Sequence, residues 1–312
     1  MGSSLVLTRR QPTRCRSPSS VVSVRLAPPF KPGRTSTYSR AMELSGKTAV
    51  ITGGASGIGL GMARSFATHE MKLVLADIEQ GALDEAVAEL SATTDVIGVR
   101  TDVSRLDEVQ ALADATMDRF GAAHVLCNNA GVGIADPVWA MSLEDWRWTI
   151  DINLWGPIYG IQVFHPIMER QGEGHINSTA SMAGLYAGQS LGAYNVSKHG
   201  VVALMASLAR DLRTAKSPIR ASVLCPGPVD TKITDSARNR SAESASQHVG
   251  TEAGNRFYAN LTAALQQGMD PDAVGDLVAD GILSDRFWMI THPNYLDGVV
   301  AQTQQIATGD LL

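Results

Sequence analysis

The chain has 312 residues, of which 44% are apolar and 18% are charged, so it has the composition of a globular protein with enough material for one large domain or two small ones. Of the net charge of −5, residues 1–41 contribute +8, which leaves −13 on residues 42–312 and argues against nucleic-acid binding, because phosphate affinity depends on clustered Lys and Arg. No stretch approaches the roughly 18 uncharged apolar residues that a membrane-spanning helix needs.

Residues 1–41 differ from the rest of the chain in composition. They contain eight Lys or Arg, no Asp or Glu, many Ser and Thr, and five prolines before position 33. Because proline interrupts helices, no amphipathic helix is expected here. We predict either a disordered basic extension or a targeting segment, since transit peptides share this Arg-rich, acid-poor composition. The expected location is therefore the cytoplasm, or an organelle matrix if the segment is a transit peptide.

From Lys47 onward, short apolar runs alternate with longer amphipathic ones. Strands are predicted at 48–53, 72–77, 95–102, 123–131, 174–181, 219–227 and 286–292. Helices are predicted at 59–69, 81–91, 104–120 with Ser104 as N-cap, 143–171, 193–214, 270–283 with Asp270 as N-cap, and 293–307. Continuous apolar strands between helices predict one α/β domain over residues 42–312, with about seven parallel strands covered by helices on both faces.

The three cysteines, Cys15, Cys127 and Cys225, are odd in number and far apart. Cys127 and Cys225 lie within apolar runs, which is typical of buried thiols in a reducing compartment and not of a disulfide framework. No His or Cys cluster has the spacing of metal ligands, so we predict no metal site.

The stretch "TAVITGGASGIGLGMA" places Gly53, Gly57 and Gly59 where a strand turns into a helix. A tight turn there needs φ > 0, and a pyrophosphate can approach backbone N–H groups only where no Cβ obstructs it. Asp77 ends the next strand, where a carboxylate can bind ribose hydroxyls and would repel a 2′-phosphate. No Arg or Lys occupies Gly54–Ser56 or the two positions after Asp77. The pattern favours NAD over NADP as the cofactor, although Asp77 could also be a simple turn residue at a strand end.

The spacing Gly-x-x-x-Gly-x-Gly, with "NNAG" at 128–131 and Tyr194-x-x-x-Lys198, resembles the short-chain dehydrogenase/reductase family over about residues 45–231. The resemblance implies a doubly wound Rossmann fold and hydride transfer between a nicotinamide cofactor and an alcohol or ketone. It also implies that Ser181, Tyr194, Lys198 and Asn153 are catalytic. The cofactor-binding residues implied are Gly53, Ser56, Gly57, Ile58, Gly59, Asp77, Asp102, Val103, Asn129, Ala130, Gly131, Tyr194, Lys198, Pro226, Gly227, Val229 and Thr231.

The chemistry explains why these residue types are needed. A secondary alcohol that loses a hydride must also lose the proton on its oxygen, and a tyrosine with an ordinary pKa of ~10 is a poor base at neutral pH. An ammonium one helical turn away, Lys198, is expected to lower the pKa of Tyr194. The Ser181 hydroxyl would hold the substrate oxygen, and Asn153 would anchor the water chain that returns the proton to solvent. Read alone, Tyr194 and Lys198 would be an ordinary surface pair.

Several features bear on the substrate and the assembly. The residues expected to line the substrate pocket are Val138, Trp139, Met141, Met182, Leu185 and Tyr186, which suggests a moderately apolar alcohol. Residues 232–268, polar over 232–256, occupy the place of the family's mobile substrate lid. The family's usual "DGG" ending, part of a tetramer interface, is replaced here by "RFWMITHPNYLDGVV", so both a homodimer and a homotetramer are open.

Two alternatives to the alcohol dehydrogenase remain open. A non-catalytic dinucleotide sensor could share the fold, but it would not need the Ser–Tyr–Lys–Asn set. A related epimerase or dehydratase usually has a Gly-x-x-Gly-x-x-Gly loop, which this sequence lacks.

Overall fold

The computed structural model describes residues 42–240 and 250–309. These residues fall within one compact unit that spans residues 41–312. The basic segment 1–41 and residues 241–249 of the predicted lid lie outside the described residues.

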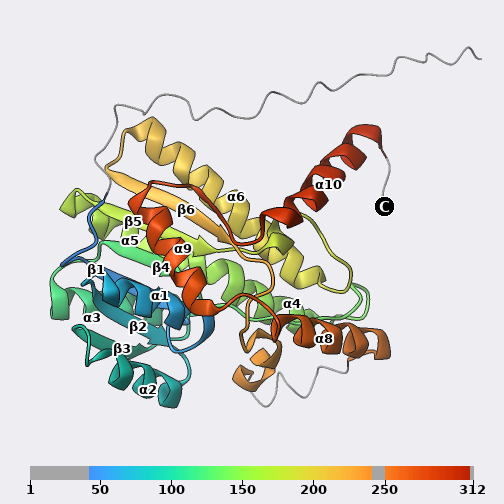
Figure 1. Cartoon of the computed structure of the whole chain (residues 1–312), viewed down its shortest axis with the longest axis horizontal. Helices are drawn as coiled ribbons and strands as arrows, with labels where there is room; N and C mark the ends of the chain where they lie inside the picture. The colour runs from blue at the N-terminus through green and yellow to red at the C-terminus, as the bar shows by residue number, and fades with distance from the viewer. Residues whose placement is uncertain (1–41, 241–249, 310–312) are drawn as a thin grey trace, which may run out of the picture. The chain divides into compact units, whose positions relative to one another are not determined.

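Seven parallel strands of the described residues form one sheet, in the order β3-β2-β1-β4-β5-β6-β7 (Figure 1). The strands are β1 (Thr48–Thr52), β2 (Lys72–Asp77), β3 (Val96–Arg100), β4 (Val125–Asn128), β5 (Gly174–Thr179), β6 (Ile219–Cys225) and β7 (Trp288–Ile290). The predicted α/β Rossmann fold with a parallel sheet is confirmed. Because the strand order reverses between β1 and β4, a crevice for ligands is expected at the carboxyl ends of these two strands.

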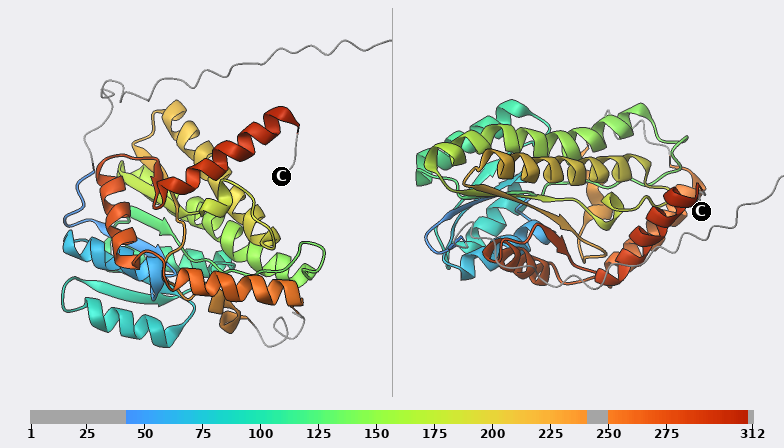
Figure 2. Two further views of the ribbon diagram at one scale, coloured as in Figure 1. Left: turned by 45° about the vertical axis from the view of Figure 1, so that its right-hand side comes forward. Right: turned by 90° about the horizontal axis from the view of Figure 1, so that it is seen from above.

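Helices cover both faces of the sheet (Figure 2). The α-helices of the described residues are α1 (Gly57–Thr68), α2 (Gln80–Leu90), α3 (Leu106–Phe120), α4 (Leu143–Ile150), α5 (Gly156–Gln171), α6 (Gly192–Ala215), α8 (Glu252–Leu265), α9 (Pro271–Leu283) and α10 (Leu296–Thr308). Side chains of α1, α2 and α9 pack with one face of the sheet, and those of α3, α5 and α6 pack with the other. Strand β1 shows the period of two: Ala49 and Ile51 belong to the first core, and Val50 belongs to the second.

Two helix predictions need correction. The stretch 143–171 is not one α-helix, because a π-helical turn, η1 (Asp151–Trp155), separates α4 from α5. Helix α3 begins at Leu106 after Arg105, because the Ser104 hydroxyl donates to Asp102 Oδ1 at 2.6 Å and does not cap the helix. The predicted start of α9 is confirmed, since the Asp270 side chain accepts from the Asp272 backbone N–H and Pro271 is the first helical residue.

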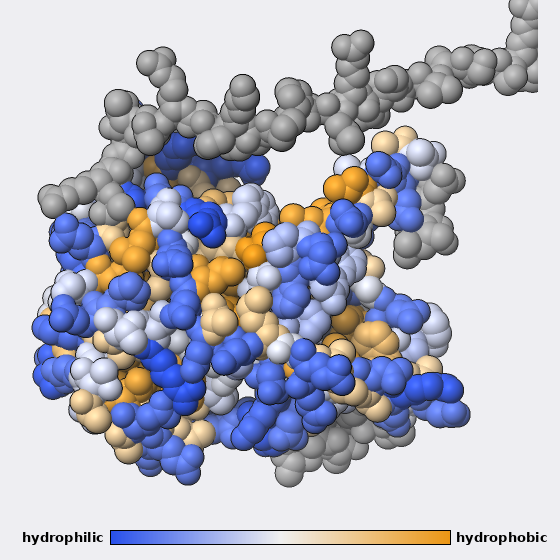
Figure 3. All heavy atoms as spheres, in the orientation of Figure 1, coloured by the Kyte–Doolittle hydropathy of each residue, from blue (hydrophilic) through white to orange (hydrophobic). Residues whose placement is uncertain are grey.

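The last helix leaves the body of the fold. Helix α10 projects beyond the layers in Figures 1 and 2, and Val300 and Ile306 on it are 50% and 75% exposed. Figure 3 shows apolar side chains where α10 joins the rest of the unit, and Leu296 and Val299 pack there against the core. No helix of the described residues is long and apolar enough to cross a membrane.

Candidate active site

The turn after β1 is built so that backbone atoms can approach a ligand closely. Gly53 and Gly57 have φ values of 62° and 51°, which side chains with a Cβ rarely adopt. A Cβ on Gly59 would lie 2.0 Å from the Gly53 carbonyl oxygen, so α1 can start directly behind the turn only with glycine there. Helix α1 begins at Gly57, and its first N–H groups lack partners within the helix. The turn therefore forms an anion-binding cradle.

Asn129 joins three strand ends beside this turn. Its Nδ2 donates to the carbonyl oxygens of Thr52 (3.1 Å) and Gly53 (3.3 Å), and its Oδ1 accepts from Thr179 Oγ1 at 3.1 Å. Its backbone N–H donates to Thr52 Oγ1 at 2.9 Å. The carboxyl ends of β1, β4 and β5 are thus held together, which fixes the floor of the crevice.

Asp77 lies at the carboxyl end of β2 with its carboxylate facing the same turn. Its Oδ2 accepts from the Ala55 N–H and its Oδ1 from the Glu79 N–H, both at 3.1 Å. Burial raises the pKa of Asp77, and the two backbone hydrogen bonds oppose that shift. The carboxylate is positioned by backbone groups on both of its oxygens.

A single cavity of about 590 Å³ contains most of the predicted site. Asp77 and Ser181 follow strands that are three strand spacings apart in the sheet, or about 14 Å, so the cavity runs along the carboxyl edge. It is lined by Ser181, Tyr194 and Lys198 and by every predicted cofactor-binding residue except Gly59, which is buried behind the turn.

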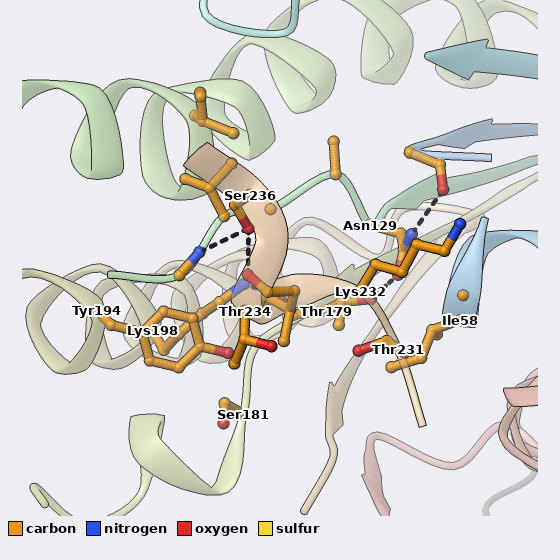
Figure 4. A pocket seen from close by; sticks show the side chains of 18 of the residues that line it. Ile58, Asn129, Thr179, Ser181, Tyr194, Lys198, Thr231, Lys232, Thr234 and Ser236 are labelled. Atoms are coloured by element: carbon orange, nitrogen blue, oxygen red, sulfur yellow. Dashed lines mark hydrogen bonds between the residues drawn. The ribbon is translucent and has the colours of Figure 1, made fainter. Parts of the chain in front are cut away.

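Ser181, Tyr194 and Lys198 come together at one place in this cavity (Figure 4). Ser181 follows β5, and its Oγ accepts from the Ala183 N–H at 3.1 Å. Tyr194 and Lys198 share one face of α6, with Lys198 Nζ 5.6 Å from the centre of the Tyr194 ring. Lys198 Nζ donates to the Thr179 carbonyl oxygen at 2.9 Å, which anchors the ammonium group to the end of β5.

Burial dominates the titration of both groups on α6. It lowers the pKa of Lys198 to about 8 and raises the pKa of Tyr194, while the hydrogen bond with Ser181 opposes the shift of Tyr194. In the protein by itself the pKa of Tyr194 is therefore not lowered overall as the sequence had suggested, because burial is the largest cause of its shift. The sequence places the ammonium one turn away, but it does not reveal how far the fold shields each group: Lys198 is buried, and Tyr194 is half-buried at the cavity wall.

Asn153 supports the site from behind. It lies in the π-helical turn η1 and is 1% exposed. Its Oδ1 accepts from the Val132 N–H at 2.8 Å, and its Nδ2 donates to the Val132 carbonyl oxygen (2.9 Å) and to Ser197 Oγ (3.2 Å). Asn153 does not line the cavity. A π turn inside a helix is frequent at functional sites, and here it brings this amide to the loop that follows β4.

The family model of the short chain dehydrogenases matches residues 47–242. The chain belongs to the short-chain dehydrogenase/reductase family. Its members are NAD(P)-dependent dehydrogenases and reductases, and the match covers the glycine turn, the loop after β4 and the Ser181, Tyr194 and Lys198 cluster.

Three relatives illustrate the likeness of this dehydrogenase/reductase. A short chain dehydrogenase/reductase from Burkholderia phymatum, solved in complex with NAD, is 42% identical, with a TM-score of 0.85 over 86% of this chain and 97% of that one. The 1-deoxy-11-beta-hydroxypentalenate dehydrogenase of Streptomyces exfoliatus is 34% identical over 80% of this chain and 85% of its own length. The C alpha-dehydrogenase of a Sphingobium strain is 31% identical over 83% of this chain and 85% of its own length.

The predicted substrate wall of this dehydrogenase/reductase is only partly found. Met182 and Tyr186 line the cavity. Trp139 is 89% exposed and Val138 is 55% exposed, because the loop before α4 turns them toward solvent. Met141 packs with Ile134 and Ala193, and Leu185 packs against the core, so these four side chains do not line the cavity.

Sequence reasoning did not name the cavity residues that follow Thr231 in the chain. Lys232 and Arg238 of the segment after β6, Tyr258 of α8 and Tyr295 before α10 all line the cavity. Arg238 binds Glu79, which lies 159 residues earlier, so no local pattern could have revealed the pair. The sequence showed no Arg or Lys close to Asp77, but Lys232 and Arg238 reach the same cavity from a distant segment, so that argument is incomplete.

The described parts of the predicted lid are the short helix η3 (Ile233–Asn239) and α8. Arg240 forms an ion pair with Asp145 of α4 at 2.6 Å, with both side chains 2% exposed, and lies 4.2 Å above the Trp148 ring. The Ser236 hydroxyl accepts from the Gly133 N–H at 3.2 Å, as Figure 4 shows. The lid's ordering on ligand binding stays a prediction.

Proposed function

We propose that this chain interconverts a secondary alcohol and its ketone, with NAD as the hydride carrier. The observation that supports this most is the convergence of Ser181, Tyr194 and Lys198 in one cavity with the glycine turn and Asp77. A binding module needs the turn and the acid but has no use for the other three together.

The residues present fit the cofactor. The turn at Gly53 and Gly57 is free of Cβ atoms and opens the start of α1 to a pyrophosphate, and the Asp77 carboxylate can accept hydrogen bonds from ribose hydroxyls. Lys198 and the residues from Pro226 to Thr231 would hold the nicotinamide half. NAD, when bound, supplies the acceptor or donor of the hydride.

The chain's own residues would handle the proton on the substrate oxygen. The Ser181 hydroxyl would hydrogen-bond that oxygen, and the Tyr194 hydroxyl would give it a proton in reduction or take one in oxidation. Lys198, with a pKa of about 8, can exchange a proton near neutral pH. Asn153 holds the loop after β4 through both backbone groups of Val132 and is next to Ser197, so we assign it to positioning this proton path.

The cavity wall supports a bulky and largely apolar substrate. Among the side chains that line the cavity, those that contribute apolar surface include Ile134, Trp148, Met182, Tyr186, Leu191, Tyr258, Leu265 and Tyr295. Apolar walls with a few convergent polar groups are typical of sites for small apolar ligands. Two relatives, the hydroxypentalenate dehydrogenase and the C alpha-dehydrogenase, are named as dehydrogenases, which agrees with oxidation of an alcohol.

NAD is the proposed cofactor in preference to NADP because of Asp77. Both of its oxygens are oriented by backbone N–H groups toward the turn, where a carboxylate accepts ribose hydroxyls and repels a 2′-phosphate. The Burkholderia phymatum relative was solved with NAD.

The test combines a substrate screen with one isosteric variant. A panel of bulky secondary alcohols and ketones is scanned for change in nicotinamide absorbance, and Tyr194→Phe is compared with the wild type on the best substrate. We expect Tyr194→Phe to bind NADH with unchanged affinity and to lose at least about a hundredfold in turnover, which is typical for removal of a general acid or base. Normal turnover in this variant would refute the mechanism. Tight NADH binding with no turnover across the panel would favour the dinucleotide sensor.

A further inference from the structure

The rim of the cavity beside Asp77 holds a cluster of opposite charges that the proposed chemistry does not use. Glu79 lies two residues after Asp77, and its N–H donates to the Asp77 carboxylate at 3.1 Å. Lys232, Arg238 and Asn239 reach the same rim from the segment after β6. Glu79, Lys232, Arg238 and Asn239 all line the cavity together with Asp77.

Glu79 accepts hydrogen bonds from the side chains of both Arg238 and Asn239. Its Oε1 accepts from Arg238 Nη2 at 2.7 Å, from Arg238 Nε at 3.1 Å and from Asn239 Nδ2 at 3.1 Å. Arg238 Nη1 donates to the carbonyl oxygens of Asp235 (2.8 Å) and Lys232 (3.3 Å) and lies 3.7 Å from Asp235 Oδ2, a longer pair whose carboxylate is 70% exposed. The pKa of Glu79 is lowered, first by the hydrogen bond from Arg238, then by that from Asn239, and further by the charges of Arg238 and Lys232. Glu79 is therefore ionised and neutralises this rim.

Stability alone does not account for this arrangement. The side chains of Arg238 and Glu79 are 29% and 32% exposed, and ion pairs open to solvent contribute little to folding. A guanidinium at a cavity that accepts dinucleotides has another consequence, because its planar fork is well suited to a phosphate group. The effect of the Arg238 guanidinium on the cofactor depends on whether its charge is neutralised and its N–H groups are hydrogen-bonded within the protein.

We propose that Glu79 is a second cofactor-selectivity residue, which keeps Arg238 from binding a 2′-phosphate on the adenosine ribose. Asp77 acts directly, by accepting ribose hydroxyls and repelling phosphate. Glu79 acts indirectly, by holding Arg238 and balancing the charge of Lys232. This inference rests on the proposed binding of the adenosine ribose at Asp77.

The proposal predicts opposite outcomes for the two halves of one ion pair. Glu79→Gln keeps the size of the side chain and removes its charge, which frees the Arg238 cation. Arg238→Gln breaks the same ion pair but removes the cation. If the pair served only to hold the segment after β6 in place, both variants would change NADH and NADPH affinity in the same direction.

The experiment measures dissociation constants of NADH and NADPH by nicotinamide fluorescence, so it needs no substrate. We expect Glu79→Gln to tighten NADPH binding about tenfold, or about 1.4 kcal/mol, with NADH affinity changed by less than about threefold. Arg238→Gln should give no gain for NADPH, and the double variant should lose the gain of Glu79→Gln. The gain should shrink as the salt concentration rises, because the contact is ionic and near solvent.

Glu89→Gln is the matched control, because it breaks the exposed Arg64 pair between α1 and α2 (2.6 Å) outside the cavity. It should leave both affinities unchanged. No NADPH gain in Glu79→Gln, or an equal gain in Arg238→Gln, would overturn the proposal. The wild type tests the proposed function separately: tighter binding of NADPH than NADH would refute the NAD preference, whatever the variants do.

Discussion

Replacing Lys198 with methionine should change the stability of the protein in a pH-dependent way, because the folded state holds this lysine at an energetic cost. Burial lowers the pKa of Lys198 from 10.5 in the unfolded chain to about 8. At pH values below about 10.5 the proton on this lysine therefore favours the unfolded state, which lowers the free energy of unfolding. The penalty is complete below about pH 8 and fades as the pH rises toward 10.5.

The size of the effect follows from the two pKa values. At 1.36 kcal/mol per unit, a difference of 2.5 units corresponds to about 3 kcal/mol at pH 7, and about 2 kcal/mol of this should disappear between pH 7 and pH 9.5. Methionine has no charge to desolvate, but it leaves the Thr179 carbonyl oxygen without the Lys198 hydrogen bond, which costs about 1–3 kcal/mol. The pH dependence is thus a sharper signature than the net change at one pH.

The assay is urea unfolding of the wild type and of Lys198→Met, without cofactor, at several values between about pH 7 and pH 9.5. The stability of the wild type should rise relative to the variant by about 2 kcal/mol over this range. Lys216→Met, at an exposed lysine just after α6, should run parallel to the wild type. If the difference between wild type and Lys198→Met stayed constant with pH, Lys198 would not be held with a lowered pKa, and its assigned part in proton exchange near neutral pH would fall.

Three further predictions concern the frame of the site. Arg240→Met should lower the free energy of unfolding, measured in urea, by about 3–5 kcal/mol, because the buried Asp145 carboxylate loses its cation. Arg119→Met, at an exposed ion pair, should lower it by no more than about 1 kcal/mol, and equal losses would contradict the burial of the Arg240 pair. Gly59→Ala should abolish NADH binding, because its Cβ would lie 2.0 Å from the Gly53 carbonyl oxygen, whereas Gly81→Ala on the open surface of α2 should bind NADH normally. Titration calorimetry measures both affinities, and normal binding by Gly59→Ala would refute the close approach. Because burial lowers the pKa of His175 to about 3, the protein should lose about 2 kcal/mol of stability between pH 7 and pH 5. The free energy of unfolding of His175→Gln should depend less on pH over this range, and an equal pH dependence would exclude His175 as the cause.

Local patterns predicted the fold and the catalytic cluster well, since each depends on residues close in sequence or on a repeated rhythm. Runs such as Leu73–Ala76 are apolar at every position, which predicts a strand buried on both faces, and β2 is such a strand. The turn at Gly53 and Gly57 has the positive φ values that its glycines suggested. Tyr194 and Lys198 share a face because four residues make about one helical turn.

The features that sequence did not predict depend on tertiary contacts. The partner of Arg238 is 159 residues away, and no periodic signal connects Glu79 to the segment after β6. Trp139 is as apolar as Trp148, yet the first is 89% exposed and the second lines the cavity, because only the folded loop decides which way each points. The sign of the pKa shift of Tyr194 likewise depends on how many protein atoms the fold places around it.

Strand β5 shows why buried polar groups alone do not mark a site. His175 and Asn177 in the body of the strand are buried, and both hydrogen-bond to Ser222 of β6, at 2.7 and 2.9 Å. These hydrogen bonds lie within the sheet, and neither side chain lines the cavity. Thr179 at the end of the same strand is also buried, but its carbonyl oxygen holds Lys198 and its hydroxyl holds Asn129. His175 and Asn177 are polar and buried, as Thr179 is, so polarity and burial do not identify the site. Position along the strand does, because only a residue at the carboxyl edge of the sheet meets groups from other elements around the cavity. Burying Lys198 destabilises the fold, whereas burying an apolar residue at the same position would not. At the carboxyl edge the buried ammonium group is placed where it can take part in the proposed proton transfer.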